Sequence, residues 1–96
     1  MIGFEWDPLK ELLNIEKHNV SFAQAIEAFK DHDGFDLDDG AHSREELRYY
    51  RVGKTLDGRI LTVRFTIRDD VIRIFGAGEW REFRSRYYEK TKHKKS

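Results

Sequence analysis

The sequence predicts an α+β fold in which a short N-terminal strand and a two-helix hairpin precede an antiparallel three-strand meander and a C-terminal helix. Three observations support this prediction. Apolar side chains recur at helical spacing over residues 9–29, three runs rich in β-branched and aromatic residues follow between residues 47 and 75, and helical spacing returns over residues 79–91. A chain of 96 residues without an internal repeat is also expected to form a single domain over residues 1–96.

The first half carries the signals of a strand and two capped helices. Gly3–Trp6 is a short extended run, and the pair Asp7–Pro8 supplies an N-cap and a first-turn proline for a helix that reaches about His18. Ser21 and Gln24 fit a capping box at the start of the second helix. The residues expected to face the core are Leu9, Leu12 and Leu13 in the first helix and Phe22, Ala25, Ile26 and Phe29 in the second.

The second half is predicted to hold the meander and the last helix. An acidic segment, Asp31–Asp39, comes first and is expected to be a solvated loop, although it could instead shield a basic surface. The strands are predicted at Leu47–Lys54, Arg59–Ile67 and Val71–Phe75, with turns at residues 57–58 and 69–70. Glycines at 76 and 78 are expected to break the last strand. The helix that follows, from Glu79 to about Thr91, places three aromatic residues on one stripe: Trp80, Phe83 and Tyr87.

Two-residue turns would fix which arginines share a face of the meander. Arg51 would then lie opposite Arg64, and Thr66 opposite Arg73. One face would carry the core-forming set Tyr50, Val52, Leu61, Val63, Phe65, Ile67, Ile72 and Ile74. The other face would gather the three arginines together with Tyr49, Thr62 and Thr66, whereas Arg48 would fall on the core side near a strand end. Such a face is either solvated and neutralised by nearby carboxylates, or an anion site, because guanidinium matches phosphate geometry.

The charge distribution favours a phosphate-bearing partner for the second half. The net charge is zero, but residues 1–46 hold twelve acids against four Lys and Arg, and residues 47–96 hold six acids against fourteen. The chain contains no cysteine, which excludes disulfides and favours a reducing compartment. The N-terminus does not read as an export signal, and no apolar run approaches the roughly 18 residues of a membrane span. A cytoplasmic protein without a membrane segment is therefore expected.

The sequence resembles the BrnT toxin family of bacterial toxin–antitoxin systems over nearly its whole length. The opening of the family pattern is matched by FEWDPLK at Phe4–Lys10, by Asn14, by KHNVSF at Lys17–Phe22 and by Ala25. The pattern continues in order and spacing with His42, Glu46, Arg48, Gly53, Gly58, Arg59, Thr66, Arg68, Arg73 and Ile74. One position departs, since many members have an arginine where this chain has Gly78, and Arg81 or Arg84 could supply that charge instead.

The resemblance implies a RelE-like ribonuclease fold, translation arrest by RNA cleavage, and neutralisation by a BrnA-type antitoxin that carries a ribbon-helix-helix DNA-binding domain. A toxin–antitoxin hetero-oligomer follows from that partner. The alternative is a catalytically silent domain that binds an antitoxin or nucleic acid, for which the loss of an arginine at Gly78 is the best argument.

RNA cleavage by the neighbouring 2′-hydroxyl needs a base, an acid and cations, and it needs no metal or cofactor. The predicted catalytic residues are Arg64 and Arg73, which would clamp the scissile phosphate, and His18, which could move a proton at neutral pH. His18 has an alternative role as a cap at the end of its helix. Glu79 and Tyr49 are the other candidates for proton transfer. The predicted RNA contacts are Arg51, Arg48, Tyr49, Lys17 and Trp80, and Lys10 could add another.

Overall fold

The computed structural model describes residues 3–42 and 45–92, and it confirms the α+β fold class. Its elements are β1 (Gly3–Trp6), α1 (Pro8–His18), α2 (Phe22–Lys30), β2 (Phe35–Asp38), the 3-10 turn η1 (Gly40–His42), β3 (Tyr49–Lys54), β4 (Ile60–Arg68), β5 (Val71–Gly78) and α3 (Arg81–Lys92). The described strands form one mixed sheet in the order β1-β5-β4-β3-β2, in which only the β1–β5 pair is parallel. The predicted meander is therefore the centre of a larger sheet.

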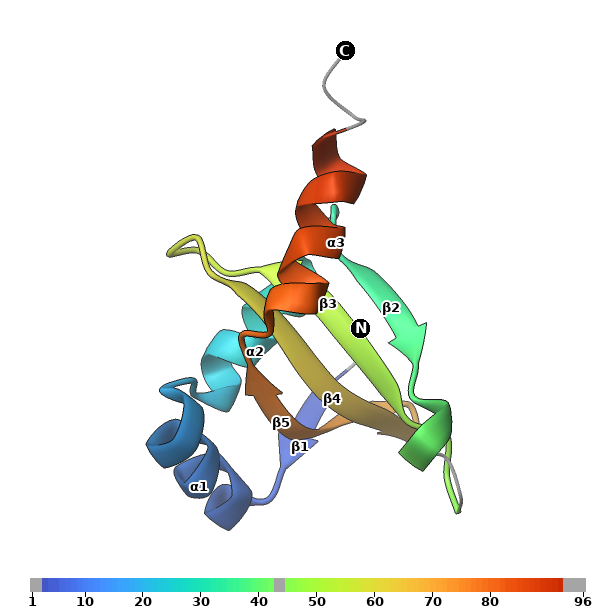
Figure 1. The fold of residues 1–96 in the computed structure, drawn as a ribbon. Helices are drawn as coiled ribbons and strands as arrows, with labels where there is room; N and C mark the ends of the chain where they lie inside the picture. The colour runs from blue at the N-terminus through green and yellow to red at the C-terminus, as the bar shows by residue number, and fades with distance from the viewer. Residues whose placement is uncertain (1–2, 43–44, 93–96) are drawn as a thin grey trace.

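The helices lie on different sides of this sheet (Figure 1). α2 covers one face, across β3, β4 and β5, whereas α3 packs on the opposite face over β3 and β4. α1 lies beside β5, past the end of β1. We call these two sides of the sheet the α2 face and the α3 face.

The predicted helix starts are confirmed in atomic detail. The Asp7 side chain accepts a hydrogen bond of 2.9 Å from the backbone N–H of Leu9, and Pro8 occupies the first turn, where no backbone donor is needed. Ser21 and Gln24 form the capping box, because each side chain accepts a hydrogen bond from the other residue's backbone N–H at 3.1 Å. These local bonds begin both helices where the sequence indicated.

The larger core lies between α2 and the sheet. Its buried residues are Val20, Phe22, Ala25, Ala28, Leu61, Val63, Phe65, Ile72, Ile74 and Ala77. Trp6 packs against this core, with its ring 5.9 Å from that of Phe22. Burial of apolar area against α2 is the main source of stability in so small a chain.

A smaller core joins α3 to the α3 face. Val52, Ile60 and Tyr87 are buried there, and Phe35 and Phe83 pack against them. The Tyr87 hydroxyl donates a hydrogen bond to the Asp31 carboxylate, which also accepts from the backbone N–H of Lys54. Phe83 and Tyr87 thus face the sheet, as their helical spacing predicted.

The predicted register between β3 and β4 is wrong by one residue. The backbone N–H of Thr55 donates to the carbonyl of Arg59, so the loop has three residues, and its last residue, Gly58, has a φ of 92°. A three-residue hairpin needs such a left-handed residue, which glycine adopts at little cost. The pairing becomes Tyr50 with Arg64 and Arg51 with Val63. Because side chains alternate, this shift moves Tyr49 and Arg51 to the α2 face and Tyr50 to the α3 face.

The second turn follows the prediction. Asp69 and Asp70 both have positive φ, 53° and 63°, as in a two-residue type I′ turn. Thr66 therefore lies opposite Arg73, as expected.

Three further expectations are corrected. The first helix does not bury its leucines, since Leu9, Leu12 and Leu13 are 63, 65 and 57% exposed. The acidic segment is not entirely a loop, because Phe35–Asp38 forms the edge strand β2 and pairs with β3. The glycines after Phe75 do not end β5 either, since the strand continues to Gly78 beyond an irregularity in its pairing with β4.

Candidate functional site

A hollow of about 290 Å³ opens between α1, β4, β5 and the residue before β3. It is lined by Lys10, Leu13, Asn14, Lys17, His18, Arg48, Arg64 and Phe75. Four of these eight side chains are Lys or Arg, a fifth is histidine, and none is acidic. We call this site the cationic hollow, and its charge suits an anionic ligand.

Of the two arginines that line the cationic hollow, Arg64 is the less engaged with the protein, since Arg48 stacks on Phe75 and lies 3.9 Å from Glu46. Its side chain is exposed, and among the described residues it forms no hydrogen bond or ion pair. It lies against the backbone of Gly76, where a Cβ atom would stand 2.5 Å from a guanidinium nitrogen. A glycine at 76 therefore leaves room for the guanidinium to lie against β5, and it has donors available to a ligand.

Asn14 fixes α1 to the sheet. Its buried side chain accepts a hydrogen bond of 3.1 Å from the N–H of Ala77 and donates bonds of 2.9 Å to the carbonyls of Ala77 and Val20. Pairing of β1 with β5 ends opposite Ile74, so the amide of Asn14 continues the edge pairing beyond that strand. This replaces bonds that the edge of β5 would otherwise make to water.

The same helix face carries the basic residues of the hollow. Lys10 lies four residues before Asn14, and Lys17 and His18 lie three and four residues after it, so all four share one side of α1. Anchoring Asn14 at β5 therefore directs the other three toward the cationic hollow.

The ring of Phe75 contacts two of the cations of the hollow. It is the extra residue at the irregularity of β5, since Ile74 pairs with Phe65 and Gly76 pairs with Arg64. The Lys10 ammonium lies 5.0 Å from the ring centroid and the Arg48 guanidinium lies 4.3 Å from it. The bulge thus turns an aromatic face toward the cations, and cation–π attraction offsets part of their mutual repulsion.

His18 and Trp80 meet at the other end of the hollow. Their ring centroids are 5.6 Å apart, and Trp80 is 38% exposed. The tryptophan lies over Gly78, where a Cβ atom would stand 2.9 Å from the indole ring and 3.4 Å from the His18 ring. Gly78 therefore leaves the space in which Trp80 lies beside His18.

Arg51 does not belong to this site, which corrects its predicted place beside Arg64. Its side chain is 15% exposed on the α2 face, where Nε donates to the Ala28 carbonyl at 3.0 Å and a terminal nitrogen donates to the Asp31 carbonyl at 2.8 Å. A third nitrogen lies 3.4 Å from the Asp36 carboxylate. Arg51 thus satisfies carbonyls at the C-terminal end of α2, a position that favours a cation.

The predicted position of Tyr49 beside Arg64 is wrong for the same reason, the shifted register. Its ring lies 5.4 Å from that of Phe65 and packs against the larger core on the α2 face, away from Arg64. Tyr50 takes the position opposite Arg64 instead. Burial and the neighbouring Asp39 carboxylate raise the pKa of Tyr50, so its hydroxyl stays protonated at neutral pH.

Arg73 lies on the α3 face, but it is paired. Its guanidinium donates to the Glu5 carboxylate at 2.7 Å, and Glu5 is its neighbour across the β1–β5 pair. Glu79, a candidate for proton transfer from the sequence, does not line the cationic hollow, and its carboxylate lies 3.9 Å from the Arg59 guanidinium. Of the residues predicted to act on RNA, the cationic hollow brings together Arg64, His18, Arg48 and Lys17, with Trp80 beside it.

The supporting roles of Asn14 and Phe75 were missed from the sequence. A signal for the first was present, because Lys10, Asn14, Lys17 and His18 recur at i, i+4, i+7 and i+8 and form a polar helical stripe. Phe75 gave no such signal, since the bulge depends on long-range pairing.

Two other features are absent from the described residues. No group of three or more His, Cys, Asp or Glu side chains there could hold a metal ion. No helix in the described part of the chain is long and apolar enough to cross a membrane.

Comparison with known proteins assigns the fold and the family. The family model described as the ribonuclease toxin BrnT of type II toxin–antitoxin systems matches residues 6–82. The crystal structure of the Brucella abortus ribonuclease toxin BrnT is similar, with a TM-score of 0.63 and 17% sequence identity over 83% of this chain and 97% of that chain. At this identity the structural likeness shows the fold alone. No curated protein matches the sequence.

Proposed function

The chain belongs to the BrnT family of ribonuclease toxins of type II toxin–antitoxin systems, and on that premise we propose that it is a cytoplasmic endoribonuclease of the mRNA interferase kind. It cleaves RNA without a metal ion and so inhibits translation. A BrnA-type antitoxin with a ribbon-helix-helix DNA-binding domain neutralises it in a hetero-oligomer.

The observation that carries this proposal is the unpaired guanidinium of Arg64 in the cationic hollow. A phosphodiester brings a negative charge that Arg64 can bind through two parallel hydrogen bonds. Lys10, Lys17 and Arg48 line the same hollow and supply further positive charge. Arg48 already lies 3.9 Å from the Glu46 carboxylate, but the hollow itself is lined by no acidic side chain, so it favours phosphate over a neutral ligand.

The proposed reaction is an attack of the ribose 2′-oxygen on the adjacent phosphorus. A base removes the 2′-hydroxyl proton, the bond from phosphorus to the 5′-oxygen breaks, and that oxygen takes up a proton from water as it leaves. The products are a 2′,3′-cyclic phosphate and a 5′-hydroxyl. His18 acts as the base, and Arg64 stabilises the extra charge on the phosphate oxygens in the transition state. Arg73 has a supporting role, because its guanidinium already binds Glu5.

The antitoxin is proposed to cover the cationic hollow. Carboxylates of the partner would neutralise the four cations, and apolar side chains would cover the exposed leucines of α1. Leu13 belongs to both surfaces, since it lines the hollow and is 57% exposed. One partner segment can therefore block the hollow and bury apolar area at the same time.

The test is cleavage of a defined single-stranded RNA by the purified chain in EDTA. The wild-type protein should cleave it, and Arg64→Ala should lose about 100-fold in rate, which corresponds to about 2.7 kcal/mol of barrier. Arg68→Ala is the matched control, because Arg68 lies on the same strand and binds Glu46 at 2.9 Å. Preparing the variants in parallel controls for contaminating ribonuclease. Intact RNA with the wild-type protein across a range of EDTA and salt would favour the catalytically silent alternative.

A further inference from the structure

α3 carries an exposed row of positive charge that the cationic hollow does not include. Arg81, Arg84, Tyr88 and Lys92 recur at i, i+3, i+7 and i+11, so they share one side of the helix, and all four are exposed. Phe83 and Tyr87 lie on the side turned to the sheet. Within the described residues, the side chains of the three cations form no ion pair. We call these four residues the α3 stripe.

The α3 stripe begins at the cationic hollow. Trp80, whose ring lies 5.6 Å from that of His18, immediately precedes Arg81, the first residue of α3. From there the helix rises by about 16 Å to Lys92, at 1.5 Å per residue. Figure 1 shows α3 crossing one face of the sheet, with its C-terminal half projecting beyond the strands. A polymer bound in the hollow can therefore continue along the helix.

The composition of the α3 stripe matches single-stranded nucleic acid. Cations spaced along a surface bind successive backbone phosphates, and an exposed aromatic ring between them offers a stacking platform for a base. Tyr88, which is 49% exposed, lies between Arg84 and Lys92 in the stripe. An acidic protein segment would also be attracted by the cations, but it would leave this ring without a stacking partner.

We propose that the α3 stripe is a second RNA-binding surface, which holds the part of the substrate that extends out of the cationic hollow. Arg81, Arg84 and Lys92 bind phosphates and Tyr88 stacks on a base. This inference rests on the proposed ribonuclease function. The family match ends at residue 82, the second residue of α3, so the family assignment does not supply it.

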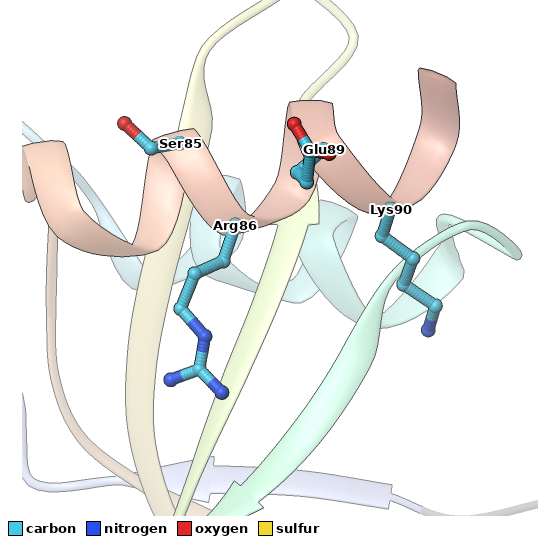
Figure 2. Close-up of a pocket in the computed structure, with 4 residues that line it drawn as sticks. All are labelled: Ser85, Arg86, Glu89 and Lys90. Carbon is cyan, nitrogen blue, oxygen red and sulfur yellow. The ribbon is translucent and has the colours of Figure 1, made fainter. Parts of the chain in front are cut away.

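α3 itself offers a matched control. Arg86 and Lys90 carry the same two charges but lie on another side of the helix, where Lys90 covers the Phe35 ring at 4.7 Å and Arg86 lies 5.9 Å from the Phe83 ring. Figure 2 shows both side chains extending from α3 over the strands, whereas Ser85 points the other way. Loss of these two charges should affect RNA far less, because exposed charges beyond a Debye length are largely screened.

The experiment measures binding of a labelled single-stranded RNA as a function of salt, in an Arg64→Ala background that keeps the RNA intact. Arg81→Gln/Arg84→Gln should weaken binding at least tenfold and reduce the slope of log affinity against log salt by about 1.4, at about 0.7 for each lost phosphate contact. Tyr88→Ala should weaken binding about tenfold without changing the slope. Arg86→Gln/Lys90→Gln should change affinity by about twofold. Thermal melts confirm that each variant is folded.

The inference is overturned if the stripe variants bind RNA as tightly as their parent, or if the control pair loses as much affinity as the stripe pair. It is also overturned if the parent does not bind RNA, or if the stripe variants lose only antitoxin binding. Its failure is distinct from failure of the proposed function. If the wild-type chain binds RNA with this pattern but leaves it intact, only the proposed ribonuclease activity is contradicted. If it cleaves RNA and the stripe substitutions do not change RNA affinity, only the role of the α3 stripe is contradicted.

Discussion

Arg51 and Arg64 lie on neighbouring strands, but truncation of Arg51 should destabilise the fold strongly, whereas truncation of Arg64 should hardly change its stability. Arg51→Ala removes two hydrogen bonds from the carbonyls of Ala28 and Asp31, on the α2 face. A hydrogen bond from a charged donor contributes about 1.5–3 kcal/mol, and the two carbonyls regain only part of this from water. The contact with Asp36 adds little, because that carboxylate is exposed. We expect a loss of about 2–4 kcal/mol in the free energy of unfolding.

The assay is thermal unfolding of both variants in one buffer. For a domain of this size each kcal/mol moves the Tm by about 4–8 °C, so Arg51→Ala should melt roughly 10–25 °C below the wild type. Arg64→Ala removes an exposed side chain and should stay within about 0.5 kcal/mol. Arg51→Lys should fall between, because an ammonium can satisfy only part of the guanidinium's bonds. A melt of Arg51→Ala within a few degrees of the wild type would refute the assigned register. A large drop for Arg64→Ala would make that arginine structural.

Two further predictions concern the pH dependence of folding and the antitoxin. Burial opposes ionisation of Asp31, but hydrogen bonds from Tyr87 and two backbone amides lower its pKa, whereas burial and the Asp31 carboxylate raise the pKa of Tyr87. Stability from Asp31 should therefore be present above its unfolded pKa of about 3.9 and disappear as the pH falls below it, and stability from Tyr87 should be present below about 10 and disappear at higher pH. Urea unfolding between acidic and alkaline pH should show both losses. Tyr87→Phe should abolish the alkaline loss and weaken the acidic one, because the Tyr87 hydroxyl is one of the donors that lower the pKa of Asp31; an unchanged alkaline limb in that variant would contradict the assignment. In the second prediction, binding of the antitoxin should protect α1 and the strands around Arg64 from hydrogen exchange and should abolish cleavage. Neutralisation that leaves these segments unprotected would show that the antitoxin acts elsewhere.

Local signals in the sequence predicted the elements well, because caps and turns are made by neighbouring residues. Asp7 and Ser21 begin their helices through bonds that span only two or three residues. The pair Asp69–Asp70 likewise makes its turn with its own backbone angles. The strand β2 was harder to predict, since its four residues are stabilised by pairing with β3 and by packing beneath α3. The RelE-like character implied by the resemblance stays a prediction.

Which side chains of β3 lie on the α2 face and which on the α3 face could not be predicted as reliably, because this depends on the length of one loop. Asp57–Gly58 is a common two-residue turn, yet Gly58 closes a three-residue loop here. One added residue exchanges the two faces of the strand, so Arg51 became a structural residue and Tyr50 came to lie opposite Arg64. The helical spacing of Leu9, Leu12 and Leu13 led to a wrong prediction of their burial, again because a long-range contact decides the outcome. α1 contacts the sheet through the amide of Asn14, and its apolar side remains exposed.

The arrangement of charges also explains why a small chain tolerates a hollow lined by four cations. The fold is stable only if the repulsion among these cations is modest. Three of them, Lys10, Lys17 and Arg64, are exposed, so water and salt screen their charges. Phe75 attracts two of them at 4.3 and 5.0 Å, which lowers the energy of the empty hollow without neutralising it. A carboxylate in the same place would stabilise the fold more, but it would also compete with phosphate for Arg64. The aromatic ring therefore offsets the repulsion between Lys10 and Arg48, of which Arg48 also lies 3.9 Å from the Glu46 carboxylate, and it leaves the guanidinium of Arg64 available to a ligand. The bulge in β5 makes this possible, because it places residue 75 between α1 and Arg48.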